Sequence, residues 1–204
     1  LKEAGVDMLT LANNHALDKG IAGLIRTYEV FRDKGFHVVG TRPDQNSRSD
    51  KIVTVHGIKI GLLAYTFETI GTETRRSLNG IPMPDGAEHL LDSFNPDRSN
   101  LLRQDLDGLI AHADRLRKEG AEMICLSLHW GVEYQTKSTS YQRQIAQCDR
   151  LRGQQAGGQH RQSRVLVARR PVCAADRTLA FDDKSGHECN KEIGARETVI
   201  NNHK

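Results

Sequence analysis

Short apolar runs alternate with amphipathic helical repeats over most of the chain, and this alternation constrains the fold more than any other feature of the sequence. Residues 6–12, 36–40 and 121–128 are apolar runs of strand length. Apolar residues recur every three or four positions over residues 18–34 and 101–118, which is typical of helices that pack on one face. Strands that alternate with helices predict an α/β fold with a layered sheet.

Turn-forming residues define the remaining elements. Residues 51–55 and 58–67 are two apolar runs joined by a His-Gly pair, which predicts a hairpin. Residues 68–99 contain several prolines and glycines, so we predict a long irregular excursion, and loops of that length often cover functional sites. We expect Asp18 to cap the first helix, Gly35 to end it, and a further helix to begin at Tyr141 and reach about Leu151.

The composition changes near Gly153. The large apolar residues Phe, Ile, Leu, Met, Val, Trp and Tyr number 47 in residues 1–152, about 31%, but only 9 in residues 153–204, about 17%. The second value lies below the roughly 20% at which burial no longer offsets chain entropy. We therefore predict a folded domain over residues 1–152 and a low-hydrophobicity tail, rich in Arg and Gln, that is disordered or frame-shifted over residues 153–204.

Composition and charge exclude several classes of protein. The chain has 29 Lys+Arg against 26 Asp+Glu and is 37% hydrophobic, as expected of a globular domain. No apolar window has the length of a membrane span, and the N-terminus opens on a charged pattern rather than on the basic and apolar regions of a signal peptide. The sequence opens without Met, so we expect the true N-terminus upstream. Few aromatic residues are present to stack on bases, so we expect no nucleic-acid partner. A nucleic-acid-binding role for the basic tail is a weaker interpretation than a solvated tail.

A first polar cluster, Asn13, Asn14 and His15, follows the predicted strand over residues 6–12. In open α/β sheets, ligands bind at the carboxyl ends of strands. An amide oxygen and an imidazole can coordinate a divalent metal ion and contact a phosphate oxygen. The alternative interpretation is that the two asparagines form a turn and that the histidine is incidental.

A second polar cluster follows the predicted strand over residues 121–128. His129 is followed by Trp130, Gly131 and Glu133. This pattern is typical of a metal ligand with a nearby acidic or orienting group. The alternative interpretation is that Trp130 covers the core and that Glu133 stays in solvent.

Three segments resemble a known family: LTLANNHALD at residues 9–18, IKIGLLAYT at residues 58–66 and LSLHWGVEY at residues 126–134. In this order and spacing they resemble the CapA family of bacterial capsule and poly-gamma-glutamate synthesis proteins, over about residues 1–147. That family is similar to the calcineurin-like metallophosphoesterases, in which a layered αββα sandwich holds two metal ions at strand ends. The resemblance implies such a sandwich here, truncated at the N-terminus and, we expect, at the C-terminus.

The resemblance also implies residue roles and a reaction. Asn14 and His129 would be metal ligands. His15 would contact the phosphoryl group as an acid, and Asp18 would orient His15. Glu133 matches the CapA pattern and joins the catalytic candidates without a defined role. The ions would be Mn, Fe, Zn or Mg, which can activate water for attack on a phosphoester. The implied partners are a phosphorylated substrate or proteins of capsule polymer synthesis and export, and the implied location is the cell envelope.

The family pattern includes further ligand segments that this sequence lacks. One would precede Leu1, and a Gly-His-x-Pro-His-like loop would follow His129 on another strand. The corresponding region here offers only His160 in an Arg- and Gln-rich run. We therefore expect weak metal binding and hypothesise that the chain is misread from about Cys148. Two alternatives to an enzyme stay open: a noncatalytic scaffold of a capsule polymer complex, and an inactive degenerate fragment.

Overall fold

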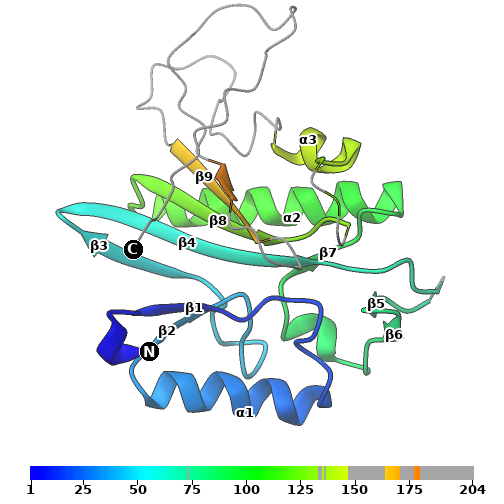
Figure 1. The fold of residues 1–204 in the computed structure, drawn as a ribbon, viewed down its shortest axis with the longest axis horizontal. Helices are drawn as coiled ribbons and strands as arrows, with labels where there is room; N and C mark the ends of the chain where they lie inside the picture. Colours follow the sequence, from blue (N-terminus) through cyan, green and yellow to red (C-terminus); the bar gives the residue numbers. More distant parts are fainter. Residues whose placement is uncertain (73, 133–134, 136, 147–163, 171–176, 180–204) are drawn as a thin grey trace, which may run out of the picture.

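The chain is arranged in layers, with sheets inside and helices outside (Figure 1). The computed structural model describes residues 1–72, 74–132, 135, 137–146, 164–170 and 177–179. Their elements, in chain order, are η1 (Lys2–Ala4), β1 (Met8–Thr10), α1 (Gly20–Asp33), β2 (His37–Val39), β3 (Lys51–Val55), β4 (Ile58–Phe67), β5 (Ser77–Leu78), β6 (Ile81–Pro82), η2 (Ala87–His89), β7 (Ser93–Phe94), α2 (Ser99–Lys118), β8 (Met123–His129), α3 (Ser140–Ala146), β9 (Arg164–Arg170) and β10 (Arg177–Leu179). The expected α/β class is confirmed.

The larger sheet has the strand order β10-β9-β8-β4-β3, and β7 also pairs with β4. β8 runs parallel to both β4 and β9, whereas β3 is antiparallel to β4. The predicted hairpin between β3 and β4 is present, and its turn residues His56 and Gly57 have φ values of 48° and 83°. Two consecutive positive φ values match the twist of the paired strands, which is why a Gly follows the His here.

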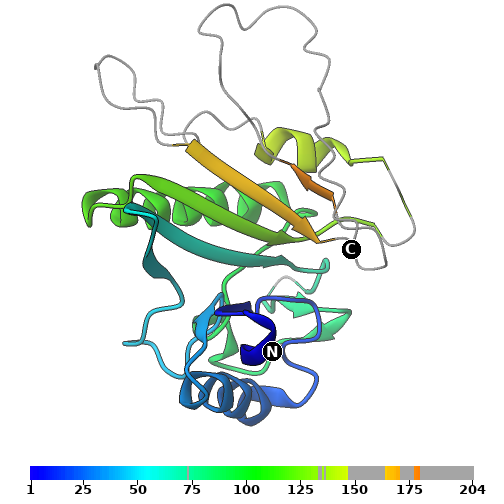
Figure 2. The same ribbon diagram turned by 60° about the vertical axis from the view of Figure 1, so that its left-hand side comes forward.

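A smaller parallel sheet of β1 and β2 lies between α1 and the larger sheet (Figures 1 and 2). Its strands have three residues each, and β1 is only half-buried, so the predicted buried strand over residues 6–12 is shorter and more accessible than expected. Gly40 follows β2 where this sheet meets β4. A Cβ atom at Gly40 would lie 2.6 Å from Cβ of Ala12 and 3.0 Å from Cβ of Ala64. The close approach of the two sheets therefore requires glycine.

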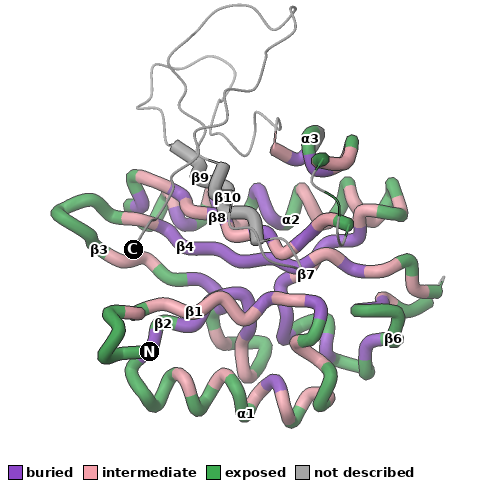
Figure 3. Tube along the Cα trace, in the orientation of Figure 1, coloured by how far each residue is buried: buried purple, intermediate pink, exposed green. Residues whose placement is uncertain are grey.

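Successive side chains of β4 belong to two different core clusters, one on each face of the strand. The central strands are the most deeply buried part of the trace (Figure 3). Leu63 and Tyr65 belong to a cluster with the apolar stripe of α2, including Leu109 and Leu116. The intervening residues of β4 belong to a second cluster, formed with β2, α1 and the residue 68–99 excursion. A strand with opposite faces in two apolar clusters must be apolar throughout, which explains the continuous run in the sequence.

Two predicted helix boundaries are corrected. Asp18 does not cap α1: the N-cap residue is Lys19, without a side-chain hydrogen bond, because the Asp18 carboxylate bonds the imidazole of His15 instead. α2 begins at Ser99, two residues earlier than predicted. Gly35 does end the first helix region, with a φ of 75°. The predicted helix from Tyr141 is present as α3, and its expected end at Leu151 lies outside the described residues.

The two strands after residue 152 lie within the predicted tail. β9 has seven residues and β10 has three, and β9 extends the larger sheet beside β8. The other tail residues lie outside the described part of the chain, so the division at residue 152 stays a prediction. No helix in the described ranges has both the length and the apolar character needed to cross a membrane.

Candidate functional site

The carboxyl ends of β1 and β8 bring together Asn14 and His129, which are 115 positions apart in the chain. Oδ1 of Asn14 lies 3.0 Å from Nε2 of His129. His129 is the last residue of β8, and Asn14 lies in the loop after β1. Asn14 is only 9% exposed, so the packing around it holds its amide in place. The structure therefore brings the two sequence-predicted metal ligands within hydrogen-bond distance.

The chemistry and spacing of this pair fit a divalent cation. An amide oxygen and an imidazole nitrogen are both metal donors. Two such ligands, each about 2.1 Å from one ion and at right angles to each other, are about 3.0 Å apart. In the described ranges no group of three or more His, Cys, Asp or Glu side chains is arranged to hold a metal ion. As metal ligands the two residues would supply only part of a coordination shell, and further donors, such as water, would have to complete it.

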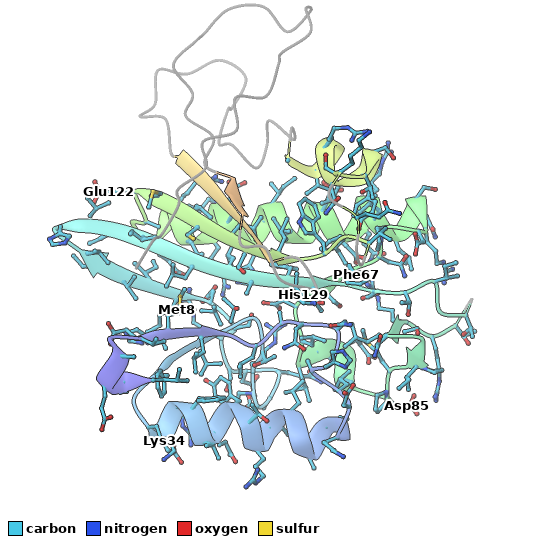
Figure 4. All side chains as sticks on the ribbon, in the orientation of Figure 1. Met8, Lys34, Phe67, Asp85, Glu122 and His129 are labelled. Carbon is cyan, nitrogen blue, oxygen red and sulfur yellow. The ribbon has the colours of Figure 1, made fainter. Side chains whose placement is uncertain are left out.

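The neighbouring strand and the core fix His129. Thr66 of β4, which is fully buried, pairs with His129 in the parallel register. The ring of Phe67 stacks on the imidazole with the centroids 6.3 Å apart and the planes at 19° (Figure 4). Trp130 is 2% exposed and packs edge-on against Phe94. Trp130 therefore does cover the core, as the alternative interpretation expected, and its packing holds the backbone next to His129.

His15 and Asp18 form a second pair in the same loop. Nδ1 of His15 lies 2.9 Å from Oδ2 of Asp18, and both side chains are about half exposed. Oδ1 of Asn13 accepts the backbone N–H of His15 at 2.9 Å, so the loop backbone is fixed by an Asx turn. When the Asp18 carboxylate accepts the Nδ1 proton, Nε2 is the ring nitrogen left to take or give a proton. The predicted orienting contact is present in the structure.

The fifth predicted site residue, Glu133, lies outside the described residues, as does His160. The role of Glu133 stays a prediction. The residues that the structure brings together are therefore two pairs, Asn14 with His129 and His15 with Asp18, joined through the consecutive positions 14 and 15.

The sequence reasoning missed a buried carboxylate beside this site. Glu68 follows Phe67 directly, is 0% exposed, and accepts hydrogen bonds from Arg76 at 2.7 Å and Ser93 at 2.6 Å. Arg76 also forms a bidentate pair with Asp105 of α2. The hydrogen bonds to Asp105 and Glu68 raise the pKa of the Arg76 guanidinium. Glu68 carries the same signal that identified His129, a polar residue at the end of a buried strand.

A small cavity of about 60 Å³ adjoins the site. Asn14, Leu17 and Asp18 line one side of it, and residues of the β5–β6 hairpin line the other. The predicted cover over residues 68–99 thus lies against the first polar cluster. A larger cavity of about 420 Å³ lies elsewhere, between the end of α1 and the start of β3. None of the predicted site residues lines that larger cavity.

Comparisons with known proteins place the chain among capsule synthesis proteins. Residues 1–148 match the family described as "Bacterial capsule synthesis protein PGA_cap". The chain is 29% identical over 151 residues to "Capsule biosynthesis protein CapA" of Bacillus anthracis, an alignment that covers 72% of this chain and 32% of the relative. It is 28% identical over 149 residues to "PGA biosynthesis protein CapA" of Bacillus subtilis (strain 168), covering 72% of this chain and 34% of the relative.

The chain spans about a third of the length of these curated relatives. The family match includes both pairs of the site, since residues 14, 15, 18 and 129 all fall inside it. A match over residues 1–148 covers well over half of the 204 residues. The chain therefore belongs to the PGA_cap family of bacterial capsule synthesis proteins.

Proposed function

We propose that this chain is part of a protein of capsule or poly-gamma-glutamate synthesis at the cell envelope, with a partial metal-dependent phosphoesterase site. The observation that carries the proposal is the 3.0 Å separation between Asn14 Oδ1, in the loop after β1, and His129 Nε2, at the end of β8. The order of layers, with helices outside two sheets, supports a metallophosphoesterase-like αββα sandwich. The names of the Bacillus relatives support the link to capsule and PGA synthesis.

In this proposal Asn14 and His129 would hold a divalent ion, Mn, Fe, Zn or Mg. When bound, such an ion polarises a phosphoryl oxygen and activates water. His15 contacts the phosphoryl group through Nε2, because Asp18 accepts the hydrogen on the other ring nitrogen. Phe67 keeps the imidazole of His129 in one plane by stacking. The substrate class is therefore a phosphorylated molecule, with proteins of polymer synthesis or export as partners.

Metal binding and phosphoester hydrolysis test this proposal directly. We would titrate Mn²⁺ and Zn²⁺ into the purified chain by calorimetry and assay p-nitrophenyl phosphate hydrolysis with each ion. His129→Ala should abolish both signals. His37→Ala is the matched control, because it removes an exposed imidazole from β2, a residue outside the proposed pair. Equal metal binding and hydrolysis by wild type and His129→Ala would contradict the assignment.

A second candidate function is a noncatalytic scaffold in a capsule polymer synthesis or export complex. The observation that favours it is the lack, within the described ranges, of three or more clustered His, Cys, Asp or Glu ligands. Two protein ligands hold a metal ion weakly. Binding of capsule-synthesis partners by a wild-type chain that shows no hydrolysis with any divalent ion would favour the scaffold over the enzyme.

A further inference from the structure

The β5–β6 hairpin has a tip whose backbone favours asparagine. Ser77 pairs with Pro82 and Leu78 with Ile81, and the two-residue turn between them is Asn79-Gly80. Asn79 has a φ of 52° and Gly80 a φ of 77°. Two positive φ values define a turn of the I′ type, for which Asn-Gly is a preferred pair. The turn therefore fixes the backbone position from which the Asn79 side chain extends.

Hydrogen bonds and a buried leucine hold this hairpin in place. Oγ1 of Thr69 lies 2.8 Å from Oγ of Ser77 and accepts the backbone N–H of Gly80 at 3.0 Å. Leu78 is 3% exposed in the core cluster beneath the hairpin. Arg76, just before β5, is tied to the buried Glu68 and to Asp105. The tip is thus part of a fixed structure, although Asn79 itself is exposed.

The tip places the Asn79 amide beside the imidazole of His15. Nδ2 of Asn79 lies 3.5 Å from Nδ1 of His15, a residue 64 positions earlier in the chain. The Asp18 carboxylate faces the same ring nitrogen at 2.9 Å and is the stronger partner for its proton. Nδ1 can make only one good hydrogen bond in the ring plane. In the described ranges Asn79 makes no shorter hydrogen bond, so its N–H groups remain available to a ligand.

We propose that Asn79 is a substrate-contacting residue whose amide donates a hydrogen bond to an anionic oxygen of the phosphorylated ligand at the His15–Asp18 pair. This inference rests on the proposed function and adds a residue from the covering hairpin to it. A neutral donor suits this position, because Asp18 already provides one negative charge close to the ligand. A second carboxylate there would repel a phosphate group.

Two substitutions separate the amide from the turn that carries it. Asn79→Gly keeps the positive φ and removes the donor, whereas Asn79→Asp keeps the turn preference and replaces the donor with a carboxylate. The probe is inorganic phosphate, titrated with Mg²⁺ present and followed by the ¹⁵N-imidazole signals of His15, which a His15→Gln sample assigns. Far-UV circular dichroism and the thermal midpoint check that both variants fold as the wild type does.

We expect the Kd for phosphate to rise about threefold to tenfold in Asn79→Gly, the value of one hydrogen bond. Asn79→Asp should weaken binding further, and added salt should reduce only this extra loss, because screening acts on charge. Unchanged binding of phosphate by Asn79→Gly would overturn the donor role, and so would binding by Asn79→Asp as tight as that of the wild type. If phosphate does not perturb His15 in the wild type, this inference and the phosphoester part of the proposed function both fail.

Discussion

Asp50 is the residue whose charge we expect to matter most for stability. Its side chain is 0% exposed and faces two guanidinium groups and one imidazole. Arg48 donates to it at 2.5 Å, His112 lies 2.5 Å away, and Arg115 donates as well. The other ring nitrogen of His112 lies 2.8 Å from the hydroxyl of Tyr65. One carboxylate thereby links the start of β3 to β4 and α2.

Asp50→Asn removes this charge and keeps the shape of the side chain. Removing one partner of a buried ion pair costs about 3–5 kcal/mol. The guanidinium groups of Arg48 and Arg115 are 45% and 47% exposed and can regain water, so we expect the lower end, about 3 kcal/mol. His112 is 10% exposed and carries most of the loss. Urea denaturation, followed by the fluorescence of Trp130, gives the free energy of unfolding.

The pH dependence provides a second measurement of the same contacts. Burial raises the pKa of Asp50, but the hydrogen bonds from His112 and Arg48 outweigh it and hold that pKa well below its usual value. A lowered carboxyl pKa stabilises the fold above the unfolded-state pKa of about 3.9, and this contribution is lost as the pH falls. The difference between wild type and Asp50→Asn should therefore be full at neutral pH and shrink below about pH 4.

The matched control is Asp85→Asn, whose carboxyl is 89% exposed and pairs with Arg75 at the surface. We expect it to change the free energy of unfolding by less than about 1 kcal/mol. A loss below about 1 kcal/mol for Asp50→Asn would refute the reasoning. So would a loss that stays constant down to low pH, because it would then come from packing rather than from charge.

Three further outcomes follow from the packing. Gly40→Ala should lower the free energy of unfolding by about 2–4 kcal/mol in the same urea assay, because the new Cβ would lie 2.6 Å from Cβ of Ala12. An unchanged free energy of unfolding would mean that the two sheets can separate. Leu126→Ala empties a position that is 1% exposed and should cost about 2–5 kcal/mol, whereas Ile58→Ala, at a position 49% exposed, serves as the low-cost control. Val55 is 45% exposed on the edge strand β3, so Val55→Lys should reduce light scattering by the concentrated chain, and unchanged scattering would contradict edge-to-edge association.

Local sequence patterns determined the elements and some of the candidate residues. The His56-Gly57 turn, the apolar stripe of α2 and the buried run of β8 each depend on residues close together in the chain, so turn chemistry and periodicity predict them. The position of His129 at a strand end follows from the same pattern. The Asn79-Gly80 turn can be recognised equally well from the sequence, but only the structure shows that Asn79 lies beside His15.

Only the tertiary structure decided which polar groups meet. Asn14 and His129 are joined across 115 positions by the approach of two sheets, and no periodicity encodes that distance. Asp18 had a plausible local role as a helix cap, but the imidazole of His15 competes for its carboxylate. Glu68 directly follows a buried strand, but only the return of residues 68–99 brings Arg76 and Ser93 to its carboxylate. The sequence limits which elements form, and the packing of those elements selects the partners, because hydrogen bonds and ion pairs depend on distances that only the folded chain fixes.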